Sequence, residues 1–133
     1  MSGRRGTEER RRAEGLGLAA EARAAWVLRL SLHRILARRF RCSAGEIDLV
    51  ARRGRTLVFV EVKARATLAA AVEAVTPQAR ARILAAADVF VARHPAYADC
   101  DRRFDIVAVL PGRWPKRLAD AFRADDLDLP RRR

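Results

Sequence analysis

The sequence contains few of the residues that stabilise small proteins through disulfides or bound zinc. It has two cysteines, Cys42 and Cys100, without C-x-x-C spacing, and two histidines, His33 and His94, that are not spaced as zinc ligands. A chain of 133 residues, half of them hydrophobic, buries enough surface to fold without such aids. We therefore expect one domain with two free thiols and no zinc site.

Long apolar runs are missing as well. The N-terminal stretch MSGRRGTEERRRAEG lacks the apolar core of a signal peptide, and no window reaches the roughly 18 apolar residues of a membrane span. No Walker A or G-x-G-x-x-G pattern occurs, and the few serines do not suit a catalytic triad. These absences predict a cytoplasmic protein and give no support to nucleotide binding.

Positive charge is abundant. The chain has 28 basic and 16 acidic residues, a net charge of +12 and a pI near 11.5. Such an excess favours a polyanionic partner, with nucleic acid first and an anionic membrane surface second. A compositional bias towards arginine and alanine is the alternative. The apolar stripes of the expected helices suit a protein core, which argues against the membrane.

Lysine is nearly absent from this basic chain. Only Lys63 and Lys116 are lysines, and Lys63 lies in the apolar stretch GEIDLVARRGRTLVFVEVKAR, two residues after Glu61. A lysine is a compact charge whose pKa shifts when it is buried, whereas arginine is a broad fork that stays protonated. We interpret Lys63 as a functional residue. The alternative is an ordinary Glu–Lys pair on a solvated face of a sheet.

The hydrophobic pattern predicts an α/β domain in which helices flank a central mixed sheet. Thr76 and Pro77 mark the start of the clearest helix, which ends before Pro95, and Trp26 is expected in the core. The other predicted elements are a helix over 13–32, strands over 35–41, 46–51, 56–64 and 103–111, and a short C-terminal helix within 116–126.

Three charged residues of the predicted hairpin share one face of the sheet. Side chains alternate along a strand, so Glu61 and Lys63 lie together, and a turn at Gly54 that pairs Asp48 with Phe59 makes Asp48 a diagonal neighbour of Glu61. Two close carboxylates repel each other unless a cation lies between them. We therefore expect Mg²⁺, held by Asp48, Glu61 and the carbonyl of Val62, with Lys63 beside a metal-bound water.

These residues carry a resemblance to a known family. GEIDLVA followed by LVFVEVKAR resembles the PD-(D/E)XK nuclease signature and, more narrowly, the YraN-like bacterial proteins, which have a restriction-endonuclease-like fold. The resemblance runs from about Gly15 to Phe122. It includes the segments GLAAEARAAWVLRL, ILARRFRC, AVTPQARARILAAA and RRFDIVAV.

The resemblance implies roles for individual residues. Asp48, Glu61 and Lys63 match the metal and catalytic set, with Mg²⁺ or Mn²⁺ as cofactor. Glu21 is similar to the helix glutamate that completes the acidic site of archaeal Holliday junction resolvases. The alternative interpretation is that Glu21 is an ordinary charged residue on the solvated face of the helix. For Asp105 we expect a structural role, paired with Arg103. The chain departs from many relatives at Ala20, where they have glycine, and at Ala79, where they often have lysine.

The implied function is a Mg-dependent endonuclease that hydrolyses DNA phosphodiester bonds, including those of branched DNA. The alternative is a non-catalytic nucleic-acid-binding module that acts with a DNA-processing partner. A homodimer and a partner from DNA repair or recombination are left open. The residues expected to grip the phosphate backbone are Arg38, Arg39, Arg41, Arg52, Arg53, Arg80 and Arg82.

The predicted organisation has three parts. Residues 1–13 form a basic, disordered leader, residues 14–124 form the nuclease-like domain, and residues 125–133 form a flexible basic tail.

Overall fold

The computed structural model describes residues 2–126, with the backbone alone for residues 2–5 and 10–16. Two 3₁₀ turns, Pro95–Tyr97 and Ala124–Asp126, accompany the helices and strands. The elements are α1 (Ser2–Leu30), β1 (Arg34–Cys42), β2 (Gly45–Arg53), β3 (Thr56–Ala64), α2 (Leu68–Ala74), α3 (Pro77–Arg93), β4 (Asp101–Val109) and β5 (Lys116–Phe122).

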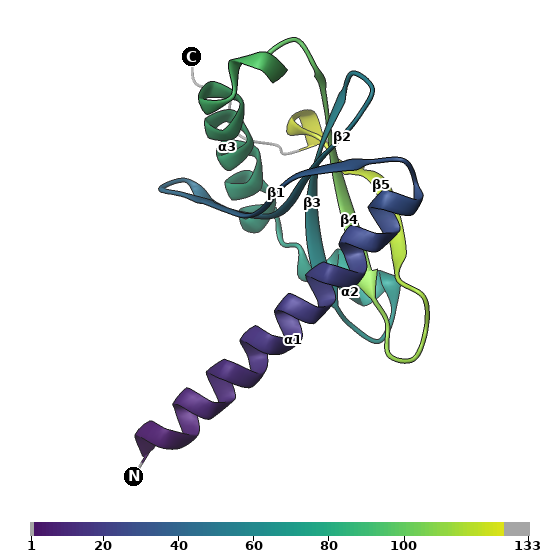
Figure 1. Cartoon of the computed structure of the whole chain (residues 1–133). Helices are drawn as coiled ribbons and strands as arrows, with labels where there is room; N and C mark the ends of the chain where they lie inside the picture. The colour runs from purple at the N-terminus through teal and green to yellow at the C-terminus, as the bar shows by residue number, and fades with distance from the viewer. Residues whose placement is uncertain (1, 127–133) are drawn as a thin grey trace.

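The five strands form one mixed sheet in the order β1-β2-β3-β4-β5 (Figure 1). β3 and β4 are parallel, because the chain crosses over through α2 and α3 between them, and the other neighbours are antiparallel. The predicted α/β class with a mixed sheet flanked by helices is confirmed. The architecture is compatible with a restriction-endonuclease-like fold.

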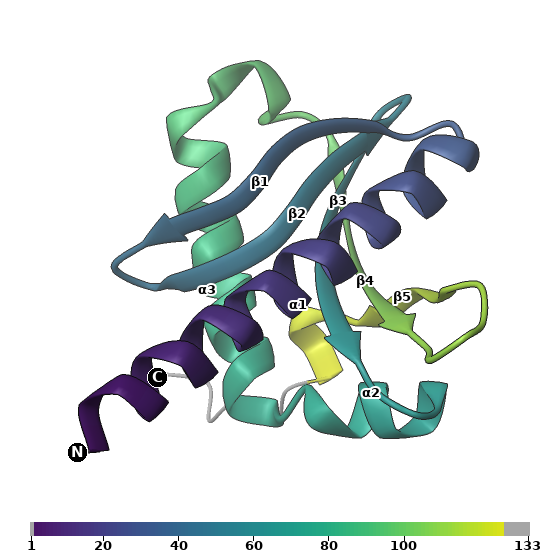
Figure 2. The ribbon, with the colours of Figure 1, turned by 60° about the horizontal axis from the view of Figure 1, so that its bottom comes forward.

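Helices α1 and α3 cover opposite faces of the sheet, as Figures 1 and 2 show. Alternation along β2 and β3 sends Val50 and Phe59 into the core beneath α3, and Leu49 and Val60 into the core beneath α1. Both faces of these central strands are buried, so the strands are almost continuously apolar. Charged residues near the ends of these strands, Asp48 on β2 and Glu61 and Lys63 on β3, are therefore unusual and are candidates for a functional site.

Helix α1 includes the leader that we predicted to be disordered. Its backbone is helical from Ser2 onwards, and its N-terminal part extends away from the sheet (Figure 1). Residues 8–14 are all Glu, Arg or Ala, which are strong helix formers, so the helix of the domain continues outwards through them. None of the helices within residues 2–126 is both long and apolar enough to cross a membrane.

Trp26 is not in the core as predicted, because 58 % of it is exposed. The buried face of α1 carries Ala24, Ala25 and Leu28. Trp26 lies two positions from both Ala24 and Leu28, which is about 200° around a helix axis. Its ring instead lies under the guanidinium of Arg29, 5.6 Å from the ring centroid.

The predicted C-terminal helix is wrong: its residues form β5 and the turn Ala124–Asp126. β5 pairs with the free edge of β4, and Phe122 is buried against Phe104 with ring centroids 5.3 Å apart. The gain from this pairing outweighs the local preference of the Ala-rich segment for a helix. Helix α2 was not predicted at all. Residues 127–133, most of the predicted tail, lie outside the described residues.

Candidate active site

The hairpin of β2 and β3 positions the candidate site. Its two-residue turn, Gly54 and Arg55, uses the left-handed backbone of Gly54 (φ 58°) and pairs Arg53 with Thr56. Val50 rather than Asp48 therefore lies opposite Phe59, so the predicted register is wrong by two residues.

A shift of two residues preserves the faces of the strands. The paired region ends at Leu49 and Val60; Asp48 and Glu61 are the next residues on the two strands, and their carboxyl groups interact with each other. Residues that face each other in this way have Cβ atoms about 4.5–5.5 Å apart. The two carboxylates are thus closer than the diagonal arrangement that the sequence predicted.

Backbone and side-chain contacts fix the orientation of these groups. The Val62 amide donates a hydrogen bond to Oδ2 of Asp48 at 2.8 Å, and Nζ of Lys63 lies 3.3 Å from Oε1 of Glu61. The side chain of Glu61 is 15 % exposed and that of Lys63 is 28 % exposed, so the group is accessible at one edge. The predicted use of the Val62 carbonyl as a ligand stays a prediction.

Burial and mutual repulsion disfavour the ionised carboxylates. Burial raises the pKa of Asp48, and the hydrogen bond from Val62 and the charge of Lys63 oppose this rise. Burial, followed by the charge of Asp48, raises the pKa of Glu61 to about 8 despite Lys63. One ammonium therefore does not compensate both carboxylates, and a second cation would stabilise the ionised pair.

The donor set suits a hard, hydrated cation. Among the side chains that the structure describes, those of residues 6–9 and 17–126, no group of three or more His, Cys, Asp and Glu converges on one point. A cation at Asp48 and Glu61 would have these two carboxylates and could take its other ligands from water, backbone or substrate. Mg²⁺ is typically bound in this manner, with one or two carboxylates and several waters.

Glu21 is held by an arginine. It is 8 % exposed, and both of its carboxylate oxygens accept from Nε of Arg39, at 3.2 and 3.0 Å. The predicted role of Glu21 at the metal stays a prediction. No sequence pattern indicates this ion pair, because its partners are 18 residues apart on a helix and a strand.

The seven predicted phosphate-binding arginines divide between regions of the domain. Arg52 and Arg53 end β2 at the turn, some 13–16 Å along the strand from Asp48 at about 3.3 Å per residue. The Nε of Arg80 donates a hydrogen bond to the carbonyl of Val75 at 3.0 Å, and the guanidinium of Arg80 lies over the ring of Phe122 on β5.

The remaining members lie on β1, the neighbour of β2, and on α3 beside the start of β2. A Cβ on Gly45 (φ 154°) would lie 3.2 Å from Cβ of Arg82, so this glycine lets α3 approach the start of β2 closely. Arg41 pairs with Glu46, whereas Arg38 and Arg82 are exposed. One further basic residue, Arg65, was missed by sequence reasoning although it follows Lys63 by only two positions. Arg38, Arg39 and Arg41 thus lie on β1 beside β2, Arg65 directly follows β3, and Arg82 lies next to the start of β2.

Asp105 has the structural role that we predicted. It is fully buried and accepts two hydrogen bonds from Arg103, at 2.8 and 2.9 Å. It also accepts from Arg117 at 3.2 Å and from the amide of Asp120 at 2.9 Å. These contacts tie β5 to β4.

Both Cys42 and Cys100 are free thiols, as expected.

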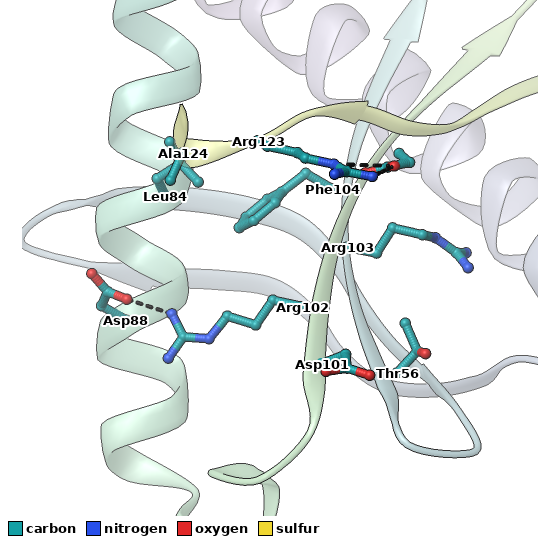
Figure 3. Close-up of a pocket in the computed structure, with 10 residues that line it drawn as sticks. Thr56, Leu84, Asp88, Asp101, Arg102, Arg103, Phe104, Arg123 and Ala124 are labelled. Atoms are coloured by element: carbon teal, nitrogen blue, oxygen red, sulfur yellow. Dashed lines mark hydrogen bonds and ion pairs between the residues drawn. The ribbon is translucent and has the colours of Figure 1, made fainter. Parts of the chain in front are cut away.

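A cavity of about 520 Å³ lies at the other end of the sheet (Figure 3). Thr56 and Asp101, which begin β3 and β4, line it, whereas Glu61 and Lys63 are near the end of β3. Figure 3 shows Arg102 reaching Asp88 on α3, while Arg103 points to the opposite side of β4. This cavity is therefore separate from the carboxylate pair.

Comparison with known proteins gives a consistent set of relatives. The model of a family described as "Uncharacterised protein family UPF0102" matches residues 20–109. A UPF0102 protein of Methylorubrum extorquens (strain PA1) is 52 % identical over 118 residues, which cover 89 % of this chain and 92 % of the relative. A UPF0102 protein of Parvibaculum lavamentivorans is 53 % identical over 81 % of each chain. One of Brucella canis is 53 % identical over 88 % of this chain and 93 % of its own.

Proposed function

Because the chain belongs to the uncharacterised UPF0102 (YraN-like) family, whose description gives no activity, we propose a function from the site itself. The protein is a metal-dependent endonuclease of the PD-(D/E)XK superfamily that hydrolyses phosphodiester bonds in DNA. The observation that carries this proposal is the position of Asp48 opposite Glu61, with Lys63 ion-paired beside them.

The carboxylates would hold Mg²⁺ or Mn²⁺ at the end of the hairpin. When bound, such an ion lowers the pKa of a coordinated water and stabilises negative charge on a phosphate. Asp48 is oriented for this role by the amide of Val62. Lys63 keeps an ammonium 3.3 Å from Glu61, where it can donate hydrogen bonds to an attacking water or to a phosphoryl oxygen.

DNA is the proposed substrate because of the charge of the domain. The chain carries a net charge of +12, and Arg41 and Arg82 lie near the start of β2, the strand that carries Asp48. Arginine and lysine contacts to phosphates supply affinity without reading sequence. We therefore expect recognition of the DNA backbone and its shape rather than of bases.

The test is a cleavage assay on linear, nicked and four-way-junction DNA with Mg²⁺, Mn²⁺ or chelator. We expect cleavage only with metal, and a loss of about 10²-fold or more in Asp48→Asn and Lys63→Ala. Glu46→Gln is the matched control, since it removes an exposed carboxylate two residues from Asp48. If the wild-type protein with metal cuts DNA no better than the two site variants, the proposed endonuclease activity is refuted.

A non-catalytic nucleic-acid-binding module is the second candidate. It is favoured by the engagement of acidic groups within the protein, since Asp48 accepts from Val62 and Glu21 is held by Arg39. Such a module would bind DNA with an affinity that falls as salt rises, and would cut none of the substrates under any metal condition.

A further inference from the structure

Arg39 has an unusual backbone conformation next to the candidate site. Its φ is 51°, in the left-handed region that arginine rarely adopts. Such backbone strain persists where surrounding contacts enforce it, and it is frequent at functional sites. The conformation is local to β1, because the neighbours Arg38 and Phe40 keep their regular partners on β2.

The sheet places Arg39 in one row with the carboxylate pair. Arg38 pairs with Leu49 and Phe40 pairs with Ile47, so the same register brings Arg39 opposite Asp48. Asp48 in turn faces Glu61 on the next strand. Neighbouring strands are about 4.8 Å apart, so the three residues occupy adjacent positions across β1, β2 and β3.

Glu21 fixes the guanidinium of Arg39 through one nitrogen. Both carboxylate oxygens accept from Nε, and within the described part of the chain neither terminal nitrogen of Arg39 has a hydrogen-bond partner. Nη2 lies along α1, where a Cβ on Gly17 would be 3.8 Å away. The side chain of Arg39 is 33 % exposed, whereas Glu21 is buried.

We propose that Arg39 is a phosphate-binding residue of this site, and that Glu21 is the positioning residue that holds its guanidinium rather than a metal ligand. The ligand is a backbone phosphate of DNA next to the one that is cut, so the inference rests on the proposed function. A guanidinium oriented through Nε presents its terminal nitrogens as a fork that matches two oxygens of one phosphate.

The first measurement is DNA affinity in chelator over a range of salt concentrations. We expect Arg39→Gln to weaken binding about ten-fold and to reduce the salt slope by about one phosphate contact. Arg102→Gln is the matched control, because Arg102 is similarly exposed, is also paired with one carboxylate, that of Asp88, and lines the cavity at the other end of the sheet. Equal losses in the two variants would overturn the role of Arg39.

Arg39→Lys tests the fork. The variant keeps the charge, but an ammonium bonded to Glu21 cannot present two further donors in a plane. We expect it to recover little of the lost affinity, and full recovery would show that charge alone acts at this position. Because Arg39→Gln leaves a buried carboxylate unpaired, the double variant Arg39→Gln/Glu21→Gln, which removes that charge, is measured beside it and is expected to bind DNA equally poorly.

The role of Glu21 is tested by two further readouts. We expect Glu21→Gln to bind Mn²⁺ within about two-fold of wild type by calorimetry, while Asp48→Asn loses the ion. We expect Glu21→Leu to bind DNA more weakly in chelator, although the substitution removes a negative charge and simple electrostatics would strengthen binding. Weakened Mn²⁺ binding in Glu21→Gln, or tighter DNA binding in Glu21→Leu, would overturn the positioning role.

These outcomes separate the inference from the proposed function. If DNA is cleaved but Arg39→Gln behaves as Arg102→Gln does, the inference about Arg39 fails, whereas the proposed endonuclease function is supported. If binding depends on Arg39 but no substrate is cut, the inference stands for a binding module.

Discussion

Glu61 carries much of the unfavourable electrostatics of the candidate site. Its carboxylate faces Asp48 in a largely buried position, and the single ammonium of Lys63 offsets only part of the burial and repulsion. Residues that reduce stability in this way persist where they serve function. Single-residue substitutions at this position should therefore separate stability from activity.

We predict that Glu61→Gln stabilises the metal-free protein while it abolishes cleavage. The pKa of Glu61 is raised to about 8 in the folded state, so folding favours its protonated form. This contribution is fully present below about pH 4.5 and is lost as pH rises through 8. At pH 8 in chelator the variant should gain roughly 1–3 kcal/mol in the free energy of unfolding, measured with urea. Glu73→Gln, at an exposed position on α2, is the control and should change little.

His33 provides a second prediction at the residue scale. It is buried, its Nε2 lies 3.0 Å from Nη2 of Arg103, and its Nδ1 has no partner within the described residues. Burial, then the charges of Arg103 and Arg117, lower its pKa, and these effects outweigh the opposing influence of the Leu28 backbone and the charge of Asp105. The unfolded chain therefore takes up the proton more readily than the folded protein does.

The stability from His33 is present above its ordinary pKa near 6.5 and is lost as pH falls through the lowered value. Between pH 7 and 5 we expect wild type to lose up to about 1.4 kcal/mol of unfolding free energy per pH unit more than His33→Gln does. His94→Gln is the control, because His94 is exposed. Identical pH profiles for wild type and His33→Gln would contradict the prediction.

At the scale of elements, β5 depends on a single buried carboxylate. Asp105 binds Arg117 and the amide of Asp120, which both belong to β5. We predict that Asp105→Ala lowers the free energy of unfolding by about 3–5 kcal/mol, because it leaves two arginines without their acceptor. The amides of β5 should exchange with solvent faster than those of β3. Asp99→Ala, in an exposed turn, should leave both strands unchanged.

The sequence predicted elements with strong local signals and missed those that depend on distant partners. Thr76 and Pro77 do cap and begin α3, with Thr76 accepting from the amide of Ala79. The hairpin followed from alternation and Gly54. β5 could not be recognised, because its strand conformation comes from pairing with β4 and its anchor is Asp105, 15 residues from Asp120.

The candidate site was predictable for a related reason. Asp48, Glu61 and Lys63 lie on two strands joined by a short turn, so alternation alone brings them together even though the predicted register was wrong by two residues. The partner of Glu21 was not predictable, because Arg39 reaches it from another element through an unusual backbone angle. The prediction that Trp26 lies in the core was wrong, because the apolar character of a side chain does not by itself identify the helix face that is buried.

At the scale of the whole molecule, charge should govern the encounter with DNA. If Arg38, Arg39, Arg41, Arg82 and Lys63 contact three to five phosphates, a plot of log affinity against log salt should have a slope between about −2.7 and −4.5. Fluorescence anisotropy on two duplexes of equal length and different sequence tests this. A preference of more than about ten-fold for one sequence would contradict recognition through the backbone.

The short turn at Gly54 and Arg55 also has a consequence for inherited variation. Substitutions in this exposed turn change little beyond it, provided that residue 54 can adopt the left-handed backbone. A single inserted codon between Arg53 and Thr56 would be different, because one step of register would turn Glu61 to the opposite face from Asp48. In descendants of this gene we expect the length of the turn to be inherited more strictly than its amino acids.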